Sequence, residues 1–130
     1  MKHYNFFNLT FALIIFSCES KDSKNNLPKT QFKQTIEKYN PISVCDCSDD
    51  GINTLKKILK IRKSFSTFEL YQKNLKSIDS VKLLKAEWTL IRDNCMKKFA
   101  AKLFMPSDCN QPDKIGSLRD ELNKLNIKTS

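Results

Sequence analysis

The sequence predicts an all-α protein, a small antiparallel bundle of four or five helices stapled by disulfides. Apolar residues recur every three or four positions through most of residues 28–125, and no stretch alternates between apolar and polar residues as a half-buried strand would. Of the five cysteines in this 130-residue chain, four lie between residues 45 and 109, where cross-links would add to the modest stability of a small core. Short helices joined by short loops favour antiparallel packing around one core.

Residues 1–17 have the order of an export signal. Lys2 precedes an apolar run from Leu9 to Phe16, and the small residue Ser17 follows that run. Even counted from Phe6 to Cys18, the apolar stretch would form only about 20 Å of helix, whereas a hydrocarbon core is about 30 Å thick. The sequence therefore predicts a cleaved signal rather than a permanent membrane span.

The segment Ile15-Phe16-Ser17-Cys18 resembles the lipobox of bacterial lipoproteins. It has an aliphatic residue at minus three, a small residue at minus one and a cysteine where the apolar run ends, although Phe16 is bulkier than the pattern prefers. The resemblance implies that diacylglyceryl is transferred to the Cys18 thiol and that the mature, acylated protein begins there. Several acyl chains of the palmitate type would make such an anchor stable. Residues 18–27 would then be the lipidated cysteine and a flexible polar tether, and residues 28–130 a single helical domain.

The first two helices are predicted from proline and capping signals. Pro28 is typical of a first helical turn and opens a helix over about residues 28–39, which Asn40-Pro41 ends. Ser48-Asp49-Asp50 supplies capping oxygens and negative charge for a second helix that runs to about Ser64.

Three further helices follow. Ser66-Thr67-Phe68-Glu69 has the capping-box pattern and begins a third helix, which the segment 77–80 either breaks or bridges. From Val81 to about Phe104 the chain has its longest regular apolar periodicity, a fourth helix that the segment 105–108 ends. A last helix carries Ile115, Leu118, Leu122 and Leu125.

Four cysteines remain after Cys18, at positions 45, 47, 95 and 109. An even number in an exported protein indicates two disulfides. A bond between Cys45 and Cys47 would close a small strained ring, so we expect this CxC pair to bond with Cys95 and Cys109, in a pairing that the sequence leaves open. A bond that encloses some 50 residues contributes about 4 kcal/mol by chain entropy. The alternatives are a four-thiolate metal site and a redox-active CxC, although metal sites usually show CxxC pairs.

Histidine is absent from the predicted mature protein, because the chain's one histidine, His3, lies in the signal. This excludes Ser-His-Asp and Cys-His nucleophile pairs, histidine-based zinc hydrolysis and histidine-ligated haem. Carboxylate catalysis needs two carboxyl groups that converge in a cleft. The helical carboxylates at positions 69, 79, 87 and 93 show no pattern that would pair them, so we expect no enzyme and no cofactor.

Asp46, Ser48, Asp50 and Gly51 match the start of a calcium loop in their spacing. The twelfth position is Lys57 instead of the bidentate glutamate that such loops require. We therefore expect this segment to be a helix cap and a disulfide turn, with no bound metal.

The formal net charge is +9, and removal of the signal with Lys2 leaves +8. Such a charge favours contact with anionic surfaces, but 20 of the 23 basic residues are lysines, which a nucleotide-composition bias would also produce. Basic stripes on the second and fourth helices are ordinarily solvated faces. Few aromatic residues interleave with them, which argues against nucleic acid as a partner. The stripes comprise Lys56, Lys60, Lys63, Lys82, Lys85, Arg92, Lys97, Lys98 and Lys102.

These features together predict a lipid-anchored protein of the cell envelope, a non-catalytic binding or structural module held to the membrane by its lipid. Its plan resembles small helical cysteine-containing lipoproteins, and that likeness transfers no activity. One alternative is an inhibitor or immunity protein whose basic face blocks an acidic enzyme or toxin. Another is a thiol redox or metal-binding protein that uses the CxC. The sequence leaves open the membrane leaflet, the anionic or protein partner and the oligomeric state.

Overall fold

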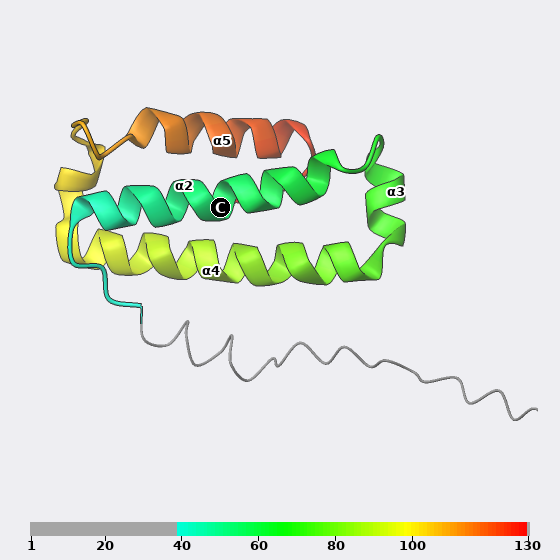
Figure 1. Cartoon of the computed structure of the whole chain (residues 1–130), viewed down its shortest axis with the longest axis horizontal. Helices are drawn as coiled ribbons and strands as arrows, with labels where there is room; N and C mark the ends of the chain where they lie inside the picture. Colours follow the sequence, from blue (N-terminus) through cyan, green and yellow to red (C-terminus); the bar gives the residue numbers. More distant parts are fainter. Residues whose placement is uncertain (1–38, 130) are drawn as a thin grey trace, which may run out of the picture.

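A computed structural model describes residues 39–129, which form a bundle built on three longer helices (Figure 1). The elements in chain order are α2 (Val44–Lys63), α3 (Phe68–Lys73), α4 (Leu75–Phe99), the 3₁₀ helix η1 (Ala100–Phe104) and α5 (Pro112–Lys124). In Figure 1, α2 lies between α4 and α5, and it packs against both. The chain runs along α4 in the direction opposite to α2 and α5. Residues 39–129 contain no strand, and the predicted disulfide-stapled all-α bundle is confirmed.

The predicted signal, Cys18, the tether and nearly all of the predicted first helix lie outside the described residues. Tyr39 is the one residue of that helix within them, and it is not helical.

The N-cap of α2 lies five residues before Ser48, the first residue of the predicted cap. Its N-cap is Ser43, whose Oγ accepts a hydrogen bond from Asp46 N at 3.1 Å, while Asp46 Oδ2 accepts one from Ser43 N at 2.9 Å. This reciprocal capping box satisfies the first free backbone donors of the helix. The predicted cap at Ser48-Asp49-Asp50 is therefore wrong, because those residues already lie inside the helix.

The third predicted helix is divided at Asn74. Thr67 caps α3 by accepting a hydrogen bond from Leu70 N at 3.3 Å, so the cap lies one residue later than predicted. Asn74 ends α3 and caps α4, since its Oδ1 accepts from Ser77 N at 2.9 Å. The segment 77–80 is consequently bridged, and α4 continues to Phe99 before the chain tightens into η1.

The main core lies along the inner face of α2. Its buried side chains come from α2, α3, α4, α5 and the segment after α5: Leu55, Ile58, Leu59, Tyr71, Val81, Trp88, Leu122 and Ile127. A smaller cluster of Cys47, Ile91 and Cys95 lies nearer the α2 N-terminus. The two clusters fix α2 against its neighbours at both ends of the bundle.

Arg62 is buried in the main core region and holds the loops at the α3 end together. Its Nε donates to Leu125 O at 3.0 Å, and its Nη1 donates to Phe65 O at 3.1 Å. The guanidinium also lies over the rings of Phe68 and Tyr71. This arginine therefore has a structural role, because its charge is compensated by carbonyl groups and aromatic faces.

Candidate functional site

The four described cysteines pair across the bundle, as the sequence predicted. Cys45 bonds to Cys109 with a Cα–Cα distance of 5.1 Å, and Cys47 bonds to Cys95 with a Cα–Cα distance of 6.0 Å. The first turn of α2 is thereby tied both to the loop before α5 and to the C-terminal part of α4. The structure supplies the pairing that the sequence left open, while Cys18 lies outside the described residues.

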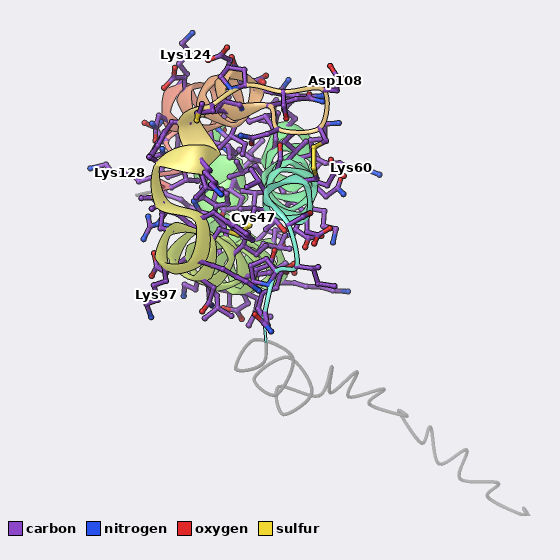
Figure 2. All side chains as sticks on the ribbon, turned by 90° about the vertical axis from the view of Figure 1, so that its left-hand side faces the viewer. Cys47, Lys60, Lys97, Asp108, Lys124 and Lys128 are labelled. Atoms are coloured by element: carbon purple, nitrogen blue, oxygen red, sulfur yellow. A yellow bond between two sulfur atoms is a disulfide. The ribbon has the colours of Figure 1, made fainter. Side chains whose placement is uncertain are left out.

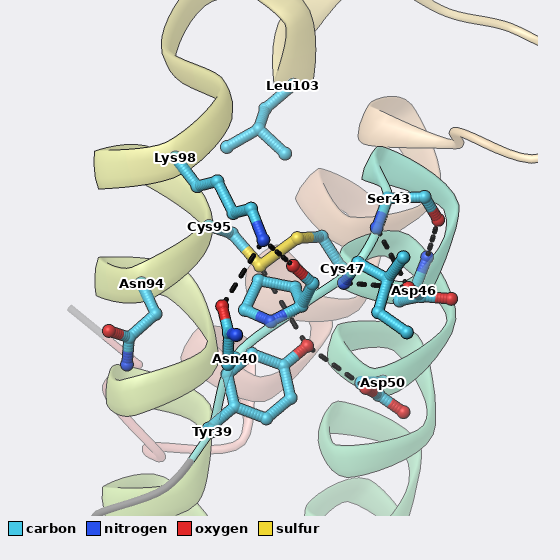
Figure 3. Close-up of a disulfide and its surroundings, with 12 residues drawn as sticks. Tyr39, Asn40, Ser43, Asp46, Cys47, Asp50, Asn94, Cys95, Lys98 and Leu103 are labelled. Carbon is cyan, nitrogen blue, oxygen red and sulfur yellow. Dashed lines mark hydrogen bonds between the residues drawn. A yellow bond between two sulfur atoms is a disulfide. The ribbon is translucent and has the colours of Figure 1, made fainter.

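The chain that enters α2 packs against the Cys47–Cys95 disulfide (Figure 3). Lys98 Nζ donates to Pro41 O at 2.6 Å and to Asn40 Oδ1 at 3.2 Å. The Tyr39 hydroxyl donates to Asp50 Oδ2 at 3.0 Å. Burial raises the pKa of that hydroxyl, and the hydrogen bond to Asp50 raises it further, so Tyr39 stays protonated at neutral pH. These contacts fix the entry segment on the α2–α4 side of the bundle.

A groove of about 440 Å³ lies between α4 and α5, with the N-terminal half of α2 as its floor. Apolar side chains dominate its lining, and the Cys47–Cys95 disulfide forms part of it. At one end, Leu103 and Phe104 of η1 close it. Phe104 is 67% exposed, and Met96 on the α4 wall is 41% exposed, so apolar surface stays open to solvent around this end. Concave apolar surfaces of this volume are typical of ligand sites in helical bundles.

The floor of the groove depends on close packing between α2 and α4. A Cβ at Gly51 would lie 2.9 Å from Trp88 Cζ3, so glycine lets the indole approach the α2 backbone. Ser48 is only 1% exposed, and its Oγ accepts a hydrogen bond from Gln111 N at 2.9 Å, which fixes the start of α5. The polar group at the floor is therefore already occupied by the protein itself.

Trp88 lines the groove and is 5% exposed. Among residues 39–129, its indole Nε1 has no hydrogen-bond partner. An unpaired buried donor costs about 1–3 kcal/mol. Since the chain has one tryptophan, its fluorescence would report directly on the groove.

Two arginines line the groove, one from each wall. Arg92 on α4 bonds to Asp93 Oδ1 through Nε and Nη2, each at 3.0 Å, and Arg119 on α5 donates from Nε to Thr129 O at 3.2 Å. The groove has no carboxylate and no histidine among its described lining residues. The site is therefore apolar with a cationic component.

A second, more open hollow of about 740 Å³ also has Arg119 in its wall. Its other described lining residues are Phe68, Asn123, Asn126, Lys128 and Thr129, which are mostly polar and carry no negative charge. The hydroxyl of Thr129 is buried and has no hydrogen-bond partner within the described segment. Arg119 thus lies where an apolar hollow and a polar, cationic one adjoin.

The two predicted basic stripes do not form one surface. Lys63 pairs with Glu121 of α5, whereas Lys98 reaches Pro41 beside the α2–α4 interface. In the end view, Lys60, Lys97 and Lys124 project from different sides of the bundle (Figure 2). The lysine charge is spread around the molecule. The two groove arginines differ from the lysines because both line the same hollow.

The groove was not predicted from the sequence. Arg92 was expected on a solvated stripe, and no role was expected for Arg119. Ile115, Gly116 and Arg119 follow one another at helical spacing on α5, as Trp88, Ile91, Arg92 and Cys95 do on α4. This spacing is a signal for a shared face, but only the structure shows that the two faces border a common hollow.

The carboxylates considered as catalytic candidates are not brought together. Glu87 accepts a hydrogen bond from Thr54 Oγ1 at 3.2 Å, and Asp79 pairs with Lys82 at 3.8 Å. Glu69 is exposed, and hydrogen bonds to its own backbone and to Thr67 lower the pKa of its carboxyl. Within residues 39–129, no cluster of three or more histidine, cysteine, aspartate or glutamate residues is arranged to hold a metal ion. None of the helices described there is both long and apolar enough to cross a membrane.

No protein-family model, curated protein or solved structure matches this chain.

Proposed function

We propose that this chain is a lipid-anchored, non-catalytic binding protein of the cell envelope, and that the groove between α4 and α5 is its binding site. The groove carries the proposal. It is a concave apolar surface of about 440 Å³ with an arginine on each wall, and no carboxylate lies among its described lining residues. Such a surface suits binding and lacks an acid–base pair for hydrolysis.

The envelope location is supported by the signal and by the disulfides. The lipobox-like segment that ends at Cys18 follows a signal-type apolar run. Two disulfides join residues 64 and 48 positions apart, and disulfides of this kind persist in exported proteins and are rare in the cytosol. An anchor at Cys18 would place the domain beside the membrane at the end of a short polar tether.

The test is intact mass spectrometry of the protein extracted from its native membranes and alkylated without reduction. We expect the mass of residues 18–130 plus acyl groups, reduced by the four protons of two disulfides, with no alkylation. A Cys18→Ser variant is the matched control, and it should lose the acyl mass and leave the membrane fraction. An unlipidated wild-type chain would contradict the anchor. Alkylated cysteines or a bound metal would favour a redox or metal role of the CxC.

A further inference from the structure

We propose that the α4–α5 groove binds a single-chain lipid with an anionic headgroup, a carboxylate or a phosphate. The headgroup lies at Arg92 and Arg119, and the acyl chain extends toward η1. This inference rests on the proposed binding function and names its ligand class.

The charges in the groove select the headgroup. Both arginines line the groove, and none of its described lining residues is a carboxylate; Asp93, which bonds to Arg92, lies outside the lining. Arg119 uses Nε for Thr129 O and has no other partner within residues 39–129, which leaves its terminal nitrogens for a ligand. Within the described part of the chain, Arg92 bonds to Asp93 alone, and the two side chains are 34% and 49% exposed, so an anionic ligand would displace a weak pair. Guanidinium groups bind carboxylates and phosphates through paired hydrogen bonds.

The shape of the groove selects one acyl chain rather than a peptide helix. The α4 wall from Trp88 to Met96 extends over about 12 Å at the rise of an α-helix. A helix docked in this open groove would insert only one face and leave its other faces in solvent. An extended hydrocarbon chain is far thinner than a helix and can follow the α4 wall toward η1.

The polar groups beside the groove favour an occupant without a backbone. Ser48 already accepts a hydrogen bond from Gln111, and the Asn110 amide already donates to three carbonyl oxygens of residues 102, 103 and 105. A peptide would bring amide groups that find few partners here, at a cost that a hydrocarbon avoids.

The exposed apolar side chains indicate where the acyl chain ends. Met96 and Phe104 remain exposed at the η1 end, opposite the end of the α5 wall where Arg119 lies. An acyl chain over them would remove apolar surface from water, which is favourable. Apolar surface at the η1 end, with Arg92 and Arg119 on the walls farther from η1, matches an amphiphile.

The direct test uses the mature chain, residues 18–130, with Cys18→Ser so that it carries no acyl group of its own. A brominated dodecanoate below its micelle concentration is added, and quenching of the single tryptophan, Trp88, is followed. We expect saturable quenching, and native mass spectrometry should show one dodecanoate per chain. Dodecanol, the neutral equivalent, should bind at least about ten-fold more weakly because it cannot form charge-assisted hydrogen bonds.

Two sets of variants separate the headgroup from the groove. The double variant Arg92→Gln/Arg119→Gln should bind dodecanoate at least about ten-fold more weakly, whereas Lys114→Gln/Lys124→Gln, with the same net charge and its changes on exposed α5 positions, should bind as the parent does. Gly116 lines the groove, and a Cβ at this position would meet no atom within 4 Å, so Gly116→Leu should block the site without disturbing the fold.

No quenching and no bound dodecanoate, or equal binding of dodecanol, would overturn the ligand class. If dodecanoate fails but Gly116→Leu abolishes retention of a defined envelope protein, the groove is still the binding site, and its occupant is a protein. Unchanged dodecanoate binding by Gly116→Leu would place the lipid outside the groove and contradict the proposal.

Discussion

Gly51 and Gly116 are the chain's two glycines, and their surroundings are opposite. A Cβ at Gly51 would press against the indole of Trp88, while a Cβ at Gly116 would meet open space. Both residues lie inside helices, where glycine costs roughly 0.5–1 kcal/mol relative to alanine. At Gly51, the close approach of Trp88 explains why a glycine is present despite this cost, whereas at Gly116 no packing contact does.

The pair gives a matched prediction. Gly51→Ala should lower the free energy of unfolding by about 1–3 kcal/mol, because the added methyl group forces the α2–α4 packing apart. Gly116→Ala should raise it by roughly 0.5–1 kcal/mol through helix propensity alone. Urea unfolding of both variants at one pH measures the difference. Equal effects at the two positions would contradict the close approach of Trp88 to α2.

Tyr71 makes stability depend on alkaline pH. Burial raises the pKa of its hydroxyl, partly opposed by Arg62, while in the unfolded chain tyrosine titrates near about pH 10. A raised native pKa means that stability is fully present below the unfolded pKa and is lost as pH rises through the folded pKa. Tyr39 acts in the same direction. The thermal midpoint should therefore decrease as the pH is raised above about 10.

The matched control is the double variant Tyr39→Phe/Tyr71→Phe, which keeps both rings and removes both titrations. Its thermal midpoint should fall less steeply over the same alkaline interval. An identical fall in parent and variant would show that other groups cause the loss.

Helix α2 shows what the sequence could and could not predict for an element. Its apolar stripe and its end near Ser64 were predicted, since both follow from local periodicity. Its start was not, because Ser43 with Asp46 and Ser48 with Asp49 and Asp50 are both plausible caps. Ser48 is instead buried and bonded to Gln111 before α5, a contact that spans 63 residues. A contact between residues so far apart in the sequence cannot be inferred from a local pattern.

The α2 cap can be tested directly. Ser43→Ala should lower the free energy of unfolding by about 1 kcal/mol, since it removes the oxygen that accepts from Asp46 N. Asp49→Ala is the comparison, because Asp49 belongs to the cap that the sequence predicted but is exposed within the helix. Its effect should stay within about 0.5 kcal/mol. Chemical denaturation of both variants measures these two losses. A larger loss for Asp49→Ala than for Ser43→Ala would instead favour the cap predicted from the sequence.

The groove illustrates the same limit at the level of two elements. The faces of α4 and α5 are readable from the spacing of their residues, but the distance between them is set by η1, the Cys45–Cys109 bond and the packing of both helices on α2. Those constraints are long-range. The fold class, the end of α2 and the start of α3 to within one residue were therefore accessible from sequence, whereas the start of α2, the break at Asn74, the groove and its arginine pair were not.

For the whole molecule, the disulfides should contribute a large share of the stability. Cys47 and Cys95 enclose a separation of 48 residues, which corresponds to about 4 kcal/mol by chain entropy. Small domains have a total margin of about 5–15 kcal/mol. The double variant Cys47→Ala/Cys95→Ala should lose about that 4 kcal/mol in urea unfolding. A loss below about 1 kcal/mol would show that the packing around this bond is sufficient without it.

The two disulfides are nested, since the first cysteine of the set pairs with the last and the second pairs with the third. If the chain is exported, as proposed above, Cys45 and Cys47 would emerge from the export channel long before either partner. An oxidase that acts in order of appearance would join these neighbours in the small strained ring described above, and the later pair would then be left to join each other. Reaching the native arrangement requires exchange between those bonds, through a thiolate and a mixed disulfide. Correct maturation of this protein should consequently depend on a disulfide isomerase in its compartment, and recombinant production is expected to need one as well.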